Sequence, residues 1–133
     1  MKKILILLLM LITIAASSQK KKEVYFQLIF ANAMYGDTEV VLEDRTRVDI
    51  HTDTFAIEVD FAKKWSESIG QSLYYSEMTN KKAGVLLIIE GEKEKRYLDR
   101  LMKVAIKHDI TVWVIDYNSD VWKRVDVVTT YSY

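Results

Sequence analysis

The sequence predicts one α/β domain in which helices flank a mixed sheet. Segments with the apolar spacing of helices alternate with segments that have the composition and period of strands. The run at residues 84–89 (GVLLII) is wholly apolar, which is typical of a central strand covered on both faces. The order of the predicted elements is α-β-β-β-α-β-α-β, and this order implies a mixed sheet with helices on its faces.

The first half of the domain is predicted to hold one helix and a β-hairpin. Residues 23–34 carry apolar side chains at four-residue intervals, as in Val24 and Leu28, so we expect a helix ended by Gly36. Residues 38–43 and 47–51 have strand composition and flank a short polar turn, which is the pattern of a hairpin.

Residues 55–60 (FAIEVD) are predicted to form a third strand with strict alternation. Because successive strand residues point to opposite faces, Ile57 and Val59 should face the core, while Glu58 and Asp60 share the other face.

The second half continues with helices at 61–78 and 92–108, separated by the strand at 84–89. An apolar strand is expected at 110–116, and residues 121–128 could add an edge strand.

The chain has 133 residues, of which 1–18 have the layout of a secretory signal peptide. Lys2 and Lys3 precede an apolar run that is too short to span a bilayer comfortably, and small residues follow it. We therefore expect cleavage near Ser18, export to the periplasm or beyond the cell, no stable membrane insertion afterwards, and a single domain at 19–133. An uncleaved membrane anchor is the alternative.

Composition excludes several classes of site. Loss of Lys2 and Lys3 would leave 17 Lys and Arg against 19 Asp and Glu, a net charge of −2. Nucleic-acid binding would then depend on local basic patches, because there is no overall basic excess. The chain has no cysteine, so disulfides, thiolate catalysis and cysteine-based zinc sites are excluded.

Three carboxylates are predicted to meet beside the central strands. Asp49 lies between Val48 and Ile50, which should face the core and turn Asp49 toward Glu58 and Asp60. Carboxylates held that close repel one another unless a cation lies between them, and Mg²⁺ or Mn²⁺ would meet that need. Taken alone, Glu58 and Asp60 would equally fit the solvated face of an edge strand.

The helix that follows adds a polar face. Lys64, Gln71 and Tyr75 are separated by seven and four residues, so they lie on one side of the helix, whereas Lys63 points about 100° away. Lys64 could supply an ammonium to the acids or could simply be a solvated helix lysine.

These residues resemble the PD-(D/E)xK restriction-endonuclease-like family. The order Asp49, then Glu58-x-Asp60 on the next strand, then a helix is similar to its Asp … Glu-x-Lys core, and Gln71-x-x-x-Tyr75 is similar to the QxxxY motif of its RecB-type nuclease branch. The run TRVDIHTDTFAIEVDFAKKWSESIGQSLYYSEMT also resembles small bacterial and phage members. The likeness covers residues 38–89 well and the last helix and strand loosely.

The resemblance implies a restriction-endonuclease-like αβββαβ core with one further helix and strand. It also implies a Mg²⁺ or Mn²⁺ ion bound by Asp49, Glu58 and the backbone carbonyl of Val59. Glu39 would be an extra carboxylate near the metal, while Gln71 and Tyr75 would position the site or the DNA.

One position departs from the family. Asp60 stands where the family has its lysine, and Lys64 could return an ammonium to the same place. Asp60 would then be a further metal ligand or the partner of Lys64.

The resulting hypothesis is an exported metal-dependent nuclease that hydrolyses phosphodiester bonds, with Asp49, Glu58, Lys64, Gln71 and Tyr75 as its site. The alternatives are a domain of the same fold that binds without catalysis, and a small structural envelope protein. The sequence leaves the oligomeric state open.

Overall fold

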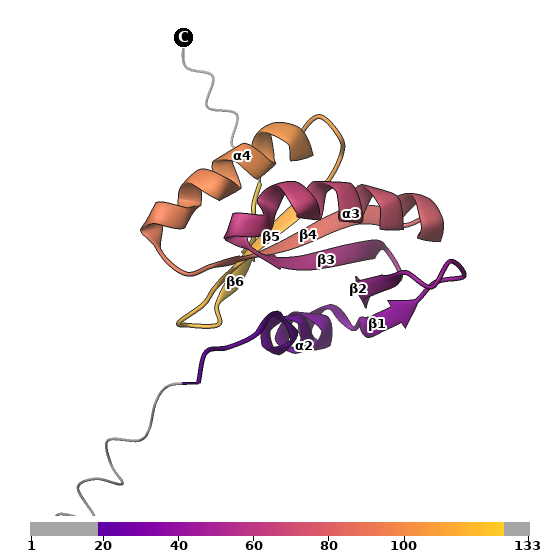
Figure 1. Ribbon diagram of the computed structural model, residues 1–133, viewed down its shortest axis with the longest axis horizontal. Coiled ribbons are helices and arrows are strands. Elements are labelled where there is room, and N and C mark those ends of the chain that lie inside the picture. Colours follow the sequence, from indigo (N-terminus) through magenta and orange to yellow (C-terminus); the bar gives the residue numbers. More distant parts are fainter. Residues whose placement is uncertain (1–18, 127–133) are drawn as a thin grey trace, which may run out of the picture.

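The computed structural model describes residues 19–126 as an α/β fold with a six-stranded mixed sheet and three helices (Figure 1). The predicted signal peptide at 1–18 and residues 127–133 lie outside the described part. The helices are α2 (Glu23–Met34), α3 (Trp65–Thr79) and α4 (Lys95–Ala105). The strands are β1 (Asp37–Val41), β2 (Arg47–His51), β3 (Phe55–Phe61), β4 (Lys82–Ile89), β5 (Thr111–Asp116) and β6 (Trp122–Arg124).

The strands lie in the sheet in the order in which they occur in the chain. β1, β2 and β3 are antiparallel neighbours, β3, β4 and β5 are parallel, and β6 is antiparallel to β5. α3 and α4 make the two parallel connections and cover one face, whereas α2 covers the other (Figure 1). No helix of the 19–126 range has the length and apolarity needed to cross a membrane.

The alternation predicted for β3 divides the core into two layers. Ile57 and Val59 pack against Phe26 and Phe30 of α2. The even-numbered residues of β3 face α3, so α3 covers Glu58 and shields it from solvent. β4 is apolar and buried from Ala83 to Ile89, as expected for a strand between two helical layers.

Several boundaries differ from the predicted ones. α2 ends at Met34, but Tyr35 takes the left-handed conformation (φ 54°) that we expected of Gly36. Gly36 is needed for a different reason, because a Cβ there would lie 2.8 Å from Cγ2 of Ile50. α4 ends at Ala105 rather than at residue 108, and β6 spans only three residues of the predicted 121–128.

Gly84 is the glycine on which packing of the central sheet depends. A Cβ at this position would lie 2.9 Å from Cγ1 of Ile57 and 3.0 Å from Cζ3 of Trp113. We expect Gly84→Ala to lower the free energy of unfolding by about 1–3 kcal/mol through overpacking, measured by urea unfolding. Gly70→Ala is the control, since its Cβ would enter open space on α3 and should stabilise by about 0.5–1 kcal/mol. Equal effects of the two substitutions would contradict this packing.

Candidate functional site

The candidate site begins where β2 and β3 separate. The two strands pair at Ile50 with Ile57 and at His51 with Ala56. Beyond this pairing, the backbone N–H of Val59 donates to Oδ2 of Asp49 at 2.8 Å. A side-chain oxygen of Asp49 therefore takes the place of a backbone carbonyl of β2 as the acceptor. Continuing this register brings Asp49 toward Glu58, and after desolvation the charge of Asp49 is the next cause that raises the pKa of Glu58.

Burial keeps these two carboxyl groups protonated to unusually high pH. Glu58 is buried, and desolvation followed by the charges of Asp49 and Asp60 raises its pKa. Desolvation also raises the pKa of Asp49, against the hydrogen bond from Val59 N–H, which lowers it. Asp49 and Glu58 therefore form a proton-sharing pair, because the charge of ionised Asp49 makes ionisation of Glu58 unfavourable without a cation.

Asp60 extends the acidic cluster along β3. Its side chain is buried, and desolvation followed by the charge of Glu23 raises its pKa to about 7, with Lys64 acting in the opposite direction. Oδ2 of Asp60 and Oε2 of Glu58 are buried and accept no hydrogen bond from any group in residues 19–126. Unpartnered carboxylate oxygens in the interior are costly, and these two oxygens lack a donor or a cation within the described part of the chain.

Lys64 is the nearest ammonium to the acids. It lies in the short 3-10 turn Ala62–Lys64, and its Nζ is 3.0 Å from Oε1 of Glu23 and 3.8 Å from Oδ1 of Asp60. It forms no ion pair with Asp49 or Glu58. The hydrogen bond with Glu23 is the largest cause that raises the pKa of Lys64, so the amine stays charged at neutral pH.

Glu39 lies beside the same pair in a strained backbone conformation. It is in the left-handed region (φ 57°) although it is in the middle of β1, and β1 pairs with β2 on both sides of it. Its carboxylate accepts from Nε2 of Gln27 at 3.0 Å and forms an ion pair with Arg47. A non-glycine residue held in this region costs about 1–3 kcal/mol, a cost met most often at functional sites.

Gln27 joins Glu39 to the strand that carries Asp49. Its buried Nε2 donates to Glu39 and, at 2.7 Å, to the backbone carbonyl of Asp49. We expect Gln27→Leu to lower the free energy of unfolding by about 2–4 kcal/mol, because it leaves two acceptors without a donor. Asn32→Leu, an exposed change on the same helix, should change it by less than about 0.5 kcal/mol. Urea unfolding of both variants tests this, and equal effects would contradict the assigned role of Gln27.

Tyr75 and Gln71 differ in position although both belong to the predicted face of α3. Tyr75 is buried against Val48 and Ala56. Burial raises the pKa of its hydroxyl, and the charges of Glu58 and Asp49 raise it further, which places the ring beside the acidic pair. Gln71 is exposed. Tyr75 is therefore part of the buried site, while Gln71 faces solvent at its margin.

Two residues of α2 belong to the site and were not among the predicted ones. Glu23 binds Lys64, and Gln27 binds Glu39 and the Asp49 backbone. They are four residues apart, so they lie on one side of α2. The sequence held a signal, because polar side chains at this spacing are unusual in so apolar a helix.

The oxygen donors of the site fit a hard divalent cation. Carboxylate and carbonyl oxygens are the ligands that Mg²⁺ and Mn²⁺ take, and Glu58 and Asp60 each present a buried oxygen with no partner. Across the described residues, no three His, Asp or Glu side chains are arranged as a ready metal cage. A cation here would therefore use two carboxylates with backbone carbonyl or water, as is common for Mg²⁺.

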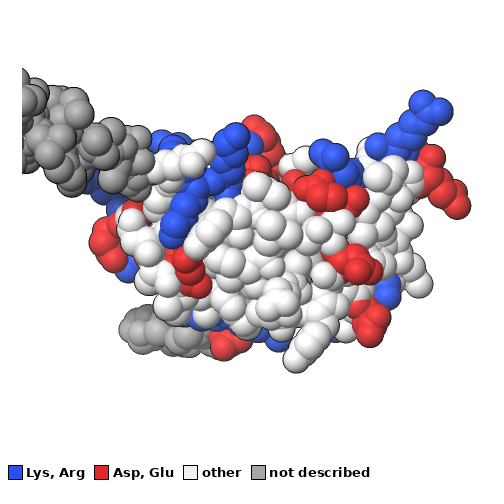
Figure 2. Space-filling view, turned by 90° about the horizontal axis from the view of Figure 1, so that it is seen from below, with Lys and Arg blue, Asp and Glu red and all other residues white. Residues whose placement is uncertain are grey.

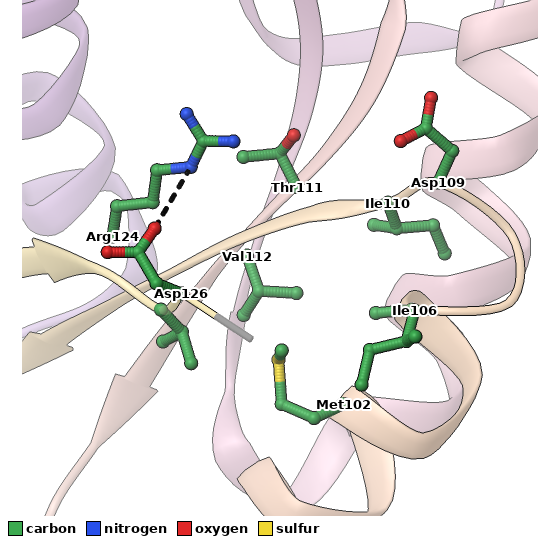
Figure 3. Close-up of a pocket in the computed structure, with 10 residues that line it drawn as sticks. Met102, Ile106, Asp109, Ile110, Thr111, Val112, Arg124 and Asp126 are labelled. Atoms are coloured by element: carbon green, nitrogen blue, oxygen red, sulfur yellow. Dashed lines mark ion pairs between the residues drawn. The ribbon is translucent and has the colours of Figure 1, made fainter. Parts of the chain in front are cut away.

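A separate hollow of about 170 Å³ lies at the end of α4, away from the acids (Figure 3). Met102, Ile106, Ile110 and Val112 form its apolar walls, and an ion pair between Arg124 and Asp126 lies along one side. It offers no buried, unpartnered polar atom. The buried, unpartnered oxygens of the described residues lie at the acidic cluster instead.

Comparison with protein-family models, with curated proteins and with solved structures gave no match. What the site can do thus follows from its own residues. They are a proton-sharing pair of half-buried Asp49 and buried Glu58, a second buried acid in Asp60, and an ammonium fixed by a glutamate of α2.

Proposed function

We propose that this protein is a divalent-metal-dependent phosphodiesterase acting on nucleic acid, with a PD-(D/E)xK restriction-endonuclease-like core, and that it works in the periplasm or outside the cell. The order α2-β1-β2-β3-α3-β4 supports the core, since it is the αβββαβ order of that fold. The observation that carries the function is the cluster of half-buried Asp49 with buried Glu58 and Asp60, because Glu58 and Asp60 each have an unpartnered oxygen that a cation would satisfy.

Each residue has a role that its position supports. Asp49 and Glu58, with the carbonyl of Val59, would hold Mg²⁺ or Mn²⁺ in place of the proton that they share. When bound, the ion would polarise the phosphate and lower the pKa of a water molecule. Lys64, fixed by Glu23 and Asp60, offsets negative charge at the phosphate. Tyr75 packs beside the pair, and Gln71 faces the substrate side.

A second candidate is a domain of the same fold that binds nucleic acid but does not cleave it. The observation that favours it is the pairing of Lys64 with Glu23 and Asp60 rather than with the acid pair. In that case Asp60 stands at the position of the family's lysine, and Lys64 does not supply the missing ammonium to Asp49 and Glu58. Cleavage assays separate the two candidates.

The test is hydrolysis of single- and double-stranded DNA and RNA by the purified chain with Mg²⁺ or Mn²⁺. We expect cleavage that stops on chelation and falls about a thousandfold or more in Glu58→Gln, because several kcal/mol of metal-dependent stabilisation is lost. Glu77→Gln, an exposed change on α3, is the matched control and should retain activity. Absence of metal-dependent cleavage of all four substrates would overturn the catalytic proposal and leave the binding domain.

A further inference from the structure

An open recess of about 500 Å³ adjoins the acidic cluster. It is lined by Lys20, Lys21, Lys22, Glu23, Val24 and Phe61. Glu23 links the recess to the site, because it binds Lys64, whereas Phe61 follows Asp60 at the end of β3 and points to the opposite face of the sheet. A ligand strand at the acids would therefore reach this recess past Glu23, around the end of β3.

The segment that forms the rim is fixed although it has no regular structure. The backbone N–H of Lys21 donates to the hydroxyl of Tyr117 at 2.8 Å. Its Nζ donates to the carbonyl of Tyr117 at 3.0 Å and to Oδ1 of Asp120 at 2.8 Å, and it lies 4.9 Å from the ring centre of Tyr25. Lys21 is therefore a structural anchor, and it holds its two neighbours in place before α2 begins.

Those neighbours carry charges that the fold leaves largely unused. Lys22 forms no ion pair with any group in residues 19–126, and its backbone is extended (φ −96°, ψ 163°). Lys20 is 75 % exposed and makes one contact of 3.5 Å, with Glu90. Figure 2 shows Lys and Arg side chains beside the point where the described chain begins, with Asp and Glu side chains among them, whereas the middle of that face is uncharged. Lys20 and Lys22 are therefore the two ammonium groups at the recess that a ligand could use.

An aromatic ring lies within reach of these amines. Phe61 is half-buried, packs edge-on against Phe26, and has Nζ of Lys20 at 5.8 Å from its ring centre. Ammonium groups beside an accessible ring match the two parts of an unpaired nucleotide, since lysine binds the phosphate while the ring stacks on the base. A paired base could not present its face in this way.

We propose that this recess is a binding subsite for a single-stranded nucleic-acid segment next to the scissile phosphate, with Lys20 and Lys22 on the backbone and Phe61 on a base. The inference rests on the proposed function, which it deepens by naming the substrate as unpaired nucleic acid. The strand would run from the acidic cluster, past Glu23, and over the end of β3.

Binding of an oligo(dT) of about 12 nucleotides, measured by fluorescence anisotropy in EDTA over a series of salt concentrations, tests the subsite. Lys20→Gln/Lys22→Gln should reduce the slope of log K against log salt by about 1.4, because each lost phosphate contact on a single strand removes about 0.7. Lys103→Gln/Lys107→Gln, the same charge change at exposed positions on α4 and in the turn that follows it, should leave the slope unchanged. Phe61→Leu should weaken binding about tenfold with the slope intact.

The outcomes separate this subsite from the catalytic proposal. Lysine-dependent binding without any metal-dependent cleavage would support the subsite and overturn hydrolysis. Cleavage that does not respond to the lysine and phenylalanine changes would leave hydrolysis standing and overturn the subsite. No binding of oligo(dT), equal slopes in the two lysine pairs, or equally tight binding of a duplex of the same length would also overturn it.

Discussion

The free energy of unfolding of the metal-free protein is expected to fall by several kcal/mol, at most about 9, between about pH 5 and about pH 9. Desolvation raises the pKa of Asp49 to about 6, of Asp60 to about 7 and of Glu58 to about 9 in the folded protein. In the unfolded chain these groups lose their protons near their ordinary values of 3.8 and 4.5.

The direction of this pH dependence follows from the number of protons that the folded and unfolded states bind. Above about pH 4 the folded protein holds protons that the unfolded chain has released, so stability decreases as pH rises. The contribution is complete below the unfolded values and is lost as pH passes through 6, 7 and 9 in turn. Asp44, Asp116 and Asp120 have lowered pKa values at exposed positions, so they act only at lower pH. Urea unfolding in EDTA across this range is the measurement, and a flat or rising profile would contradict the burial of the acids.

Glu58→Gln is expected to stabilise the metal-free protein by several kcal/mol, at most about 6, at about pH 9 and to remove more than half of the pH dependence. Glutamine keeps the shape of the protonated side chain and removes a charge that would otherwise form beside Asp49 and Asp60. The same substitution should abolish metal-dependent cleavage. A residue that lowers stability while it enables function is the expected property of an active-site acid.

Glu77→Gln is the matched control for this experiment as well. Its side chain is exposed on α3, so its free energy of unfolding should change by less than about 0.5 kcal/mol at every pH. If Glu58→Gln destabilises the protein at about pH 9 while Glu77→Gln does not, Glu58 contributes to packing rather than to a strained acidic pair.

The spacing of apolar residues alone predicts much of the fold, because it shows which residues of each helix or strand lie on the same side. The alternation of β3 predicted that Ile57 and Val59 face the core and that Glu58 and Asp60 share the other face, and the structure adds that the core side is covered by α2. The apolar run of β4 likewise predicted a strand buried between helices. These inferences needed only the geometry of one element at a time.

How elements meet is less accessible from sequence. Glu23 and Gln27 reach the site because α2 crosses the sheet at β1 to β3, and no local pattern specifies that crossing. The partner of Lys64 depends on the same placement. The left-handed conformation of Glu39 was not predictable either, since a glutamate within a strand carries no signal for it.

The most direct test of the central claim is a calorimetric titration of the purified protein with Mn²⁺ in two buffers that differ in ionisation enthalpy. If the acids form a divalent-metal site, one Mn²⁺ should bind per chain and displace about one proton at neutral pH, because the shared proton of Asp49 and Glu58 must leave. Glu58→Gln should lose this binding, and Glu77→Gln should retain it. Absence of Mn²⁺ binding, or binding that Glu58→Gln leaves unchanged, would contradict the metal site.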